Sequence, residues 1–293
     1  MKKIASLAAA LAIIGSIACA ADSYTIAGSD ILGKTLKEPL AALLEKRGIK
    51  TNIDMKGSFT ALDALKKSQV DVAIIALPRG EKAPNEFITF PFAYLVATVA
   101  VNVANPIEEI TTSQLYKIFS SSATPRVDTW QAMNVGNASL KNIMPVTTSF
   151  SDSIILELFK YGALKSTGIG KWVNIAKSPS EALSILRANN SAIAVLGKVE
   201  DRNMIKVLAI ASDNDGGANK YAFRPDRDNI FNGDYPLALS FNIAVEKQKA
   251  AKLKPLLKAL LDDETAALID SGEYISAPKN SRKKSIFELD ILK

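Results

Sequence analysis

The sequence predicts an α/β fold built on mainly parallel sheets, and three observations predict it. Short apolar segments with strand character alternate with amphipathic helical segments along the chain. Three of the predicted strands run into loops rich in Ser, Thr and Asp that lead directly into a helix. The 293-residue chain is long enough for one large domain or for two lobes of ordinary size. Because a strand–helix–strand connection places its two strands parallel, the alternation indicates parallel pairing.

The first unit combines a strand at residues 23–27, a turn at residues 28–30 and a helix. Leucines at helical spacing give this helix one apolar side, at Leu32, Leu36, Leu40, Leu43 and Leu44. Pro39 lies within that pattern. Because proline is favoured in the first turn of a helix, we expect Pro39 to open a second helical segment.

The second unit repeats the plan with a strand at residues 51–55, a turn at residues 57–60, a short helix carrying Leu62 and Leu65, and an apolar strand at residues 70–77. A third unit has a strand at residues 143–146 followed by the most hydroxyl-rich window of the chain, residues 147–153. A helix is predicted after it, with its apolar side at Ile154, Ile155, Leu158 and Phe159.

The remaining segments complete an alternating chain without repeats or low-complexity tracts. Strands are predicted at residues 93–103, 192–196, 205–210 and 236–245. Helices are predicted through residues 115–119, 180–188, 255–261 and 264–269. Residues 212–234 are polar and rich in Gly, Asn and Asp, which is typical of a surface loop or of a link between lobes.

The N-terminus has the three parts of a secretory signal peptide. Lys2 and Lys3 precede an apolar run of 14 residues at positions 4–17, and Ala18-Cys19-Ala20 supplies small residues before a cut. A membrane anchor is the first alternative, but a spanning helix needs about 20 apolar residues. A lipid on Cys19 is the second alternative, although Ser16 stands where such signals usually carry Leu. We expect residues 1–20 to be a cleaved signal peptide.

Composition restricts the chemistry of the exported protein. Cleavage after Ala20 removes the only cysteine of the chain, and histidine is absent, so thiol nucleophiles, disulfides, thiolate metal sites and the commonest general base are excluded. We therefore expect neither an enzyme nor a cofactor or metal. Loss of Lys2 and Lys3 lowers the formal net charge from +6 to +4. The basic residues are scattered and not interleaved with aromatic ones, so nucleic acid is not an expected partner.

The three hydroxyl-bearing loops are candidate anion sites. They contain Ser29 and Asp30, then Ser58 and Thr60, then the 147–153 cluster. The first backbone N–H groups of a helix point outward and bind anions with the help of the helix dipole, and hydroxyls can add hydrogen bonds. In a parallel sheet, such loops meet at the carboxyl edge of the strands. The alternative for each loop is that Ser, Thr and Asp serve only as helix caps.

The order of these segments resembles that in the phosphate-binding subunit of ABC-type phosphate importers, which is a two-lobed type II periplasmic binding protein. The matching pieces span nearly the whole exported chain. They are Ala27-Gly28-Ser29-Asp30-Ile31-Leu32-Gly33, Gly57-Ser58-Phe59-Thr60 with Asp71-Val72-Ala73 after it, Asn105-Pro106-Ile107, Gln114-Leu115-Tyr116-Lys117-Ile118-Phe119-Ser120, Trp130, and Tyr235-Pro236-Leu237.

This resemblance implies two α/β lobes, each with a mainly parallel central sheet, joined by two crossover strands. Lobe 1 would comprise residues 21–97 plus 237–293, and lobe 2 residues 98–236. By analogy the ligand shell would contain Ser29, Asp30, Ile31, Ser58, Phe59, Thr60, Ser149, Ser151 and Asp152. The resemblance further implies a monomeric periplasmic receptor that passes a phosphate-like oxyanion to the membrane permease of an ABC importer.

The sequence also departs from the family pattern at three places. No Arg or Lys lies between Met144 and Phe159, where the family carries an arginine for a charge-assisted contact. Ala76 and Leu77 stand where an Asp or Ser is common, and Ala238 follows Tyr-Pro-Leu in place of an arginine. Arg79 is near enough to Ala76 and Leu77 to compensate for the missing polar contacts. The alternative is that Arg79 is a solvated loop residue.

Three hypotheses therefore stand. The leading one is a non-catalytic solute-binding protein for phosphate or a related small oxyanion. The alternative is a sensor or envelope interaction protein that keeps this fold with a degenerate ligand site. A phosphatase using Ser58 or Ser149 as nucleophile is the third, and it lacks a recognisable general base.

Overall fold

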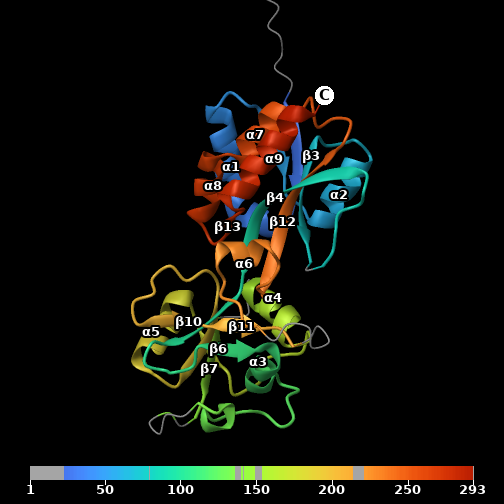
Figure 1. The fold of residues 1–293 in the computed structure, drawn as a ribbon. Helices are drawn as coiled ribbons and strands as arrows, with labels where there is room; N and C mark the ends of the chain where they lie inside the picture. The colour runs from blue at the N-terminus through green and yellow to red at the C-terminus, as the bar shows by residue number, and fades with distance from the viewer. Residues whose placement is uncertain are drawn as a thin grey trace, which may run out of the picture.

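The computed structural model describes residues 23–78, 80–135, 140, 142–148, 154–213 and 221–292, and it shows two lobes (Figure 1). Within these residues, one lobe is built on a six-stranded sheet, and the other on a five-stranded sheet with an additional two-stranded one. The first lobe contains both the beginning and the end of the described chain, in blue and red in Figure 1. The two-lobed α/β fold expected from the sequence is thus confirmed.

The six-stranded sheet of the first lobe has the strand order β13-β4-β12-β3-β1-β2. Its strands are β1 (Tyr24–Gly28), β2 (Thr51–Asp54), β3 (Val72–Leu77), β4 (Phe87–Val96), β12 (Ala238–Glu246) and β13 (Ile275–Ser276). β1 pairs in parallel with both β2 and β3, whereas β12 is antiparallel to β3 and β4. The sheet is therefore mixed, because the chain leaves this lobe along β4 and returns along β12.

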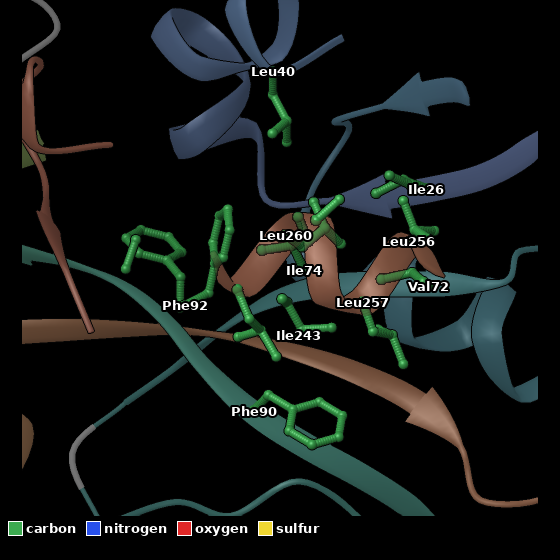
Figure 2. Close-up of a cluster of buried hydrophobic side chains, with 14 of the residues drawn as sticks. Ile26, Leu40, Val72, Ile74, Phe90, Phe92, Ile243, Leu256, Leu257 and Leu260 are labelled. Atoms are coloured by element: carbon green, nitrogen blue, oxygen red, sulfur yellow. The ribbon is translucent and has the colours of Figure 1, made fainter. Parts of the chain in front are cut away.

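Helices cover both faces of this sheet. They are α1 (Asp30–Lys46), α2 (Ser58–Lys66), α7 (Lys254–Leu261), α8 (Asp263–Asp270) and α9 (Lys279–Ile291). α1 and α7 pack their leucines against Ile26, Ile74 and Ile243 of the sheet, and Figure 2 shows part of this core. α2 packs on the opposite face, where Ala61 and Leu65 meet Ala73 and Ile75.

The second lobe has a five-stranded mixed sheet in the order β10-β5-β9-β7-β8, beside the pair β11-β6. Its strands are β5 (Thr98–Asn102), β6 (Glu109–Thr111), β7 (Met144–Thr148), β8 (Asn174–Ala176), β9 (Ala192–Leu196), β10 (Ile205–Val207) and β11 (Ala209–Ala211). Its helices are α3 (Thr112–Phe119), α4 (Ile154–Ala163), α5 (Pro179–Ala188) and α6 (Arg227–Phe231), with a short 3-10 turn at Gln131–Met133. α6 lies at the junction with the first lobe (Figure 1).

Residues 212–234 were expected to form a loop or a link, but Arg227–Phe231 within them form the helix α6. Four further differences from the sequence-based expectation have a clear physical reason. α1 continues through Pro39, because Leu36 and Leu40 on either side of it are buried and packing outweighs the one lost hydrogen bond. β4 begins at Phe87 and carries Pro91 at a register shift, where the ladder does not need its missing N–H. The apolar run 205–210 splits at Leu208 into two strands of different sheets.

The fourth difference is α9, which the sequence pattern did not reveal. Its residues are mostly polar, so no apolar stripe of helical period marks it. Arg282, a buried residue of this helix, donates to the carbonyl oxygens of Ala277 at 3.1 Å and Leu261 at 2.9 Å. The helix is therefore held by tertiary hydrogen bonds that a local pattern does not contain.

Two crossing segments connect the lobes and are bonded to each other. The Ala97 N–H donates to the Leu237 carbonyl oxygen at 2.9 Å. The buried hydroxyl of Tyr235 donates to the Ala97 carbonyl oxygen at 2.8 Å, and burial raises the pKa of this phenol. In the described part of the chain, no helix is long and apolar enough to cross a membrane.

Candidate functional site

The start of α1 is capped by a buried serine. Ser29 is fully buried and its Oγ accepts the Ile31 N–H at 3.3 Å, while its own N–H donates to the Ile74 carbonyl oxygen at 2.9 Å. Asp30, the next residue, is exposed in the first turn. The Ser29 side chain thus satisfies one of the free N–H groups of this helix, as the capping alternative predicts.

The first turn of α1 is also held from the C-terminal part of the chain. The Tyr274 hydroxyl donates to the Ile31 carbonyl oxygen at 2.8 Å. Burial raises the pKa of Tyr274 to about 12, so the phenol is a neutral donor at physiological pH. Sequence analysis missed this residue, because no pattern links two positions 243 residues apart.

The start of α2 has no side-chain cap. Gly57 is the N-cap residue with φ 135° and ψ 148°, and Ser58 is the first helical residue. The sequence placed Ser58 in the capping loop, whereas its Oγ accepts the Ala76 N–H from the end of β3 at 2.8 Å. Phe59 is 87% exposed and Thr60 is also exposed, so the first turn of α2 is open to solvent.

The two helix starts lie side by side, because β1 and β2 are neighbours in the sheet. The Gly57 N–H donates to the Gly28 carbonyl oxygen at 2.9 Å and ties the two loops together. A β-carbon at Gly28 would collide with the Met55 sulfur and lie 3.1 Å from the Ile74 carbonyl oxygen. Glycine at position 28 therefore permits the close approach of the loops.

Of the predicted shell, the structure brings together Ser29, Asp30 and Ile31 with Ser58, Phe59 and Thr60 through this loop contact. Ser149, Ser151 and Asp152 lie outside the described residues, as does Arg79. The strand β7 and the helix α4, which the third loop joins, are both described.

A cleft of about 680 Å³ opens between the lobes beside α4. The second lobe contributes Ile154, Glu157, Leu158, Tyr161 and Gly162 of α4 together with Ser212, and the first lobe and the crossing segments contribute Pro78, Gly80, Pro236, Ala238 and Leu239. Pro78 is two residues beyond Ala76, the hydrogen-bond partner of Ser58. The cleft therefore begins where β3 ends, and none of the six described residues of the predicted shell lines it.

Most of the described residues that line the cleft are apolar, and a few of them can form hydrogen bonds. Glu157 is its acidic member and is paired with Lys160 at 2.8 Å. Neither lysine nor arginine is among the described lining residues. The described part of the lining therefore offers an anion backbone N–H groups and hydroxyls, which act through dipoles without a full charge. No cluster of described residues has the composition of a metal site.

Comparison with known sequences gives one curated relative, Protein SphX of Synechococcus elongatus strain PCC 7942. It is 25% identical over 231 residues, which are 74% of this chain and 66% of that protein. The alignment therefore spans just under two thirds of the length of the relative.

Solved structures share the fold. A possible phosphate binding protein from Planctomyces limnophilus has a TM-score of 0.69 at 19% identity, with 93% of this chain and 99% of that one covered. PstS from Borrelia burgdorferi gives 0.67 at 15% identity, covering 87% and 98%. An ABC-type phosphate transport receptor from Vibrio cholerae gives 0.58 at 22% identity, covering 86% and 99%.

A family profile covers most of the sequence. The profile described as the PBP superfamily domain matches residues 16–262, which include the second lobe, the first lobe without α8, β13 and α9, and the starts of α1 and α2. The chain belongs to the PBP superfamily.

Proposed function

We propose that the protein is an extracytoplasmic solute-binding protein that closes its lobes around phosphate or a related small oxyanion. The observation that carries this proposal is the open first turn of α2, which has no side-chain cap and is bonded through Ser58 to Ala76, two residues before the cleft residue Pro78. Backbone N–H groups in such a turn bind anions. Family membership supports a binding role, and two proteins of similar structure are a possible phosphate binding protein and an ABC-type phosphate transport receptor.

The proposed ligand shell combines three loops. Ser58, Phe59 and Thr60 would contribute mainly backbone N–H groups, and the Ser58 hydroxyl, which accepts the Ala76 N–H, keeps a proton to donate. The Ile31 N–H would be shared between the ligand and Ser29 Oγ, and the fully buried Ser29 would act through the helix start that it caps. Asp30 would accept a proton from a protonated ligand oxygen. The third loop would close the shell with Ser149, Ser151 and Asp152.

Closure requires a hinge, and we place it at the bonded crossing segments. Lobe 1 would be residues 21–97 plus 237–293 and lobe 2 residues 98–236, moving about Ala97 and Leu237. The hydrogen bond between these two residues and that from Tyr235 keep the crossing strands together while the lobes rotate. Small-angle X-ray scattering should show a lower radius of gyration with phosphate than without it.

Export and delivery complete the proposal. The N-terminal residues 1–20 would be removed as a signal peptide, and the monomeric protein would act in the periplasm. Its partner would be the membrane permease of an ABC importer. N-terminal sequencing of the protein from the cell envelope tests the cut after Ala20, and a start at residue 1 would contradict it.

A matched pair of variants at position 58 tests the role of the α2 N-terminus. Ser58→Ala and Ser58→Pro both remove the hydroxyl, but only proline also removes the backbone N–H, and proline is well tolerated at the first helical position. A charge-assisted hydrogen bond contributes about 1.5–3 kcal/mol. Calorimetry should therefore show phosphate binding at least about tenfold weaker in Ser58→Pro than in Ser58→Ala.

Two results would contradict this role. Equal affinities of the pair would show that this N–H does not touch the ligand. No heat with millimolar phosphate in the unaltered protein would refute the phosphate assignment itself. Sulfate is the control ligand, because it tests whether a protonated oxyanion is required.

The second candidate is a sensor or interaction protein of this fold with a degenerate ligand site. It is favoured by the absence of lysine and arginine from the described lining of the cleft and by Ala76 at the end of β3. A calorimetric screen of phosphate, phosphite, arsenate and sulfate without response, together with specific capture of an envelope protein, would favour this candidate.

A further inference from the structure

A second cavity, of about 550 Å³, lies on the same face of the six-stranded sheet as α2, next to the area that α2 covers. Its floor is formed by β4 and β12, and one wall is the segment that follows β3, residues 80–85. The opposite wall comes from the end of α6, at Ile230 and Phe231. Volumes of about 300–1,000 Å³ are typical of small-molecule sites.

The irregularity in β4 determines which side chains form the floor of the cavity. Opposite the register shift between Phe241 and Asn242, β4 has one extra residue, Phe92. Pro91 pairs with Asn242 and Tyr94 pairs with Ser240, so all four line the same cavity. The bulge thereby directs Tyr94 away from the core behind the sheet, where Phe92 and Ala93 both pack.

Tyr94 brings its phenol hydroxyl into this cavity. The residue is only 5% exposed, but no buried side-chain polar atom of the described residues lacks a hydrogen-bond partner, so this hydroxyl, which bonds to no other described residue, is open to the space of the cavity. Burial raises the pKa of Tyr94 to about 12, so the group is a neutral donor and acceptor. A hydroxyl that faces a cavity without a protein partner bonds to water there, and a ligand hydroxyl can take the place of that water.

The other polar groups of the floor are also uncharged. Asn242 donates through Nδ2 to Ser240 Oγ at 3.3 Å, and Ser240 Oγ donates to the Leu77 carbonyl oxygen at 3.1 Å. The Oδ1 atom of Asn242 remains available as an acceptor among the described residues, and Thr89 adds an exposed hydroxyl at the edge. Phe87, Pro91 and Ile230 supply apolar surface around these groups.

The charged residues lie at the mouth of the cavity. Glu81, Lys82 and Lys247 are all exposed, and among the described residues of the floor the phenol of Tyr94 is the only ionisable group. A charged ligand group on this floor would lose its hydration without gaining a counter-charge, which is costly. Hydroxyl groups suit the floor, because they donate and accept as the phenol and the amide require.

We propose that this cavity is a second binding site, for an uncharged sugar or cyclic polyol. Its hydroxyls would bond to Tyr94 and Asn242, and the carbon face of its ring would pack on Pro91 and Phe87. The site is separate from the proposed oxyanion site, because its floor strands β4 and β12 lie on the other side of β3 from β1 and β2, which lead into the first two shell loops. Among the described residues, the cavity shares Pro78, Gly80 and Ala238 with the interlobe cleft.

Saturation-transfer NMR of the full exported protein with glucose, trehalose and myo-inositol tests the proposal. At least one of these probes should receive saturation at millimolar concentration. Tyr94→Phe removes only the hydroxyl and should weaken that binding about five- to tenfold. Tyr161→Phe is the matched control, because Tyr161 lies on α4 outside this cavity, and it should bind the probe as the unaltered protein does.

Absence of transfer to all three probes would overturn the proposal. Equal binding by Tyr94→Phe and the unaltered protein would also overturn it, because the probe would then bind elsewhere. Thr89→Val is the second variant, chosen because Thr89 is exposed and its change leaves the core intact. It should weaken binding about two- to fivefold if the probe reaches the edge of the floor. Phosphate calorimetry on the same samples separates this result from the proposed function.

Discussion

The starts of α1 and α2 follow neighbouring strands of one sheet, and yet they are built differently. α1 begins with Ser29, which is fully buried and bonds the Ile31 N–H. α2 begins with Gly57, which has no side chain to offer, and its first turn is exposed. Similar residues in the two loops thus have different roles. In the first loop a serine caps the helix, and in the second the helix start stays open, which is the geometry we propose for anion binding. The first start has its Ile31 N–H bonded to a side chain, whereas the second has no side-chain cap at all.

Three substitutions test this difference between the two helix starts, and the largest effect is expected at Gly57. Its φ of 135° with ψ of 148° is a conformation that essentially only glycine adopts. No atom lies closer than 3.9 Å to an added β-carbon, so the cost of Gly57→Ala comes from backbone strain. We expect a loss of about 2–3 kcal/mol in the free energy of unfolding, measured by urea denaturation, and a loss of phosphate binding.

Gly48→Ala is the matched control for this substitution. Gly48 also has a positive φ of 75° with open space around it, but it lies at the far end of α1. It should destabilise the protein by about 1–2 kcal/mol and leave phosphate affinity unchanged. If both variants lost binding equally, general destabilisation and not the α2 start would be responsible.

The next effect is expected at the α1 cap. Ser29→Ala removes the acceptor of the Ile31 N–H and should lower the free energy of unfolding by about 1 kcal/mol. Phosphate affinity should change by less than about threefold, because the buried cap acts on the helix and not on the ligand. A large loss of affinity with full stability would contradict the contrast between the two starts.

The smallest effect is expected at Phe59. Its ring is 87% exposed, so Phe59→Ala should change the free energy of unfolding by less than about 0.5 kcal/mol. If only the backbone of this turn binds the ligand, phosphate affinity should also remain unchanged in calorimetry. Weaker binding would show that the ring itself contacts the ligand and that the site uses more than N–H groups.

The predicted strands and helices were mostly found, and the failures share one cause. Alternating apolar segments located β1, β2, β3 and the helices between them, because periodicity is a local property. α9 and the split of residues 205–210 depend on Arg282 and on pairing with distant strands, which no local pattern contains. The pairing of β12 with β3 and β4 likewise turned the expected mainly parallel sheet into a mixed one.

The candidate site was predictable to the same extent as the fold: its local features were visible in the sequence, and its long-range contacts were not. The hydroxyl-rich loops and their position after strands were visible in the sequence, and so was the absence of arginine from the third loop. Tyr274 and Tyr94 were not, since each acts through residues far away in the chain or across a bulge. The shell residues themselves remain a prediction, which the variants at positions 58 and 57 test.

The sequence by itself determined the α/β class, the loops that begin helices and the chemistry available without histidine, because composition and periodicity are properties of the chain alone. The tertiary structure decided how each loop uses its residues. Ser29 caps its own helix, whereas Ser58 bonds Ala76 of a neighbouring strand. A hydroxyl binds whichever donor packing brings within reach, and only the folded chain fixes that neighbour.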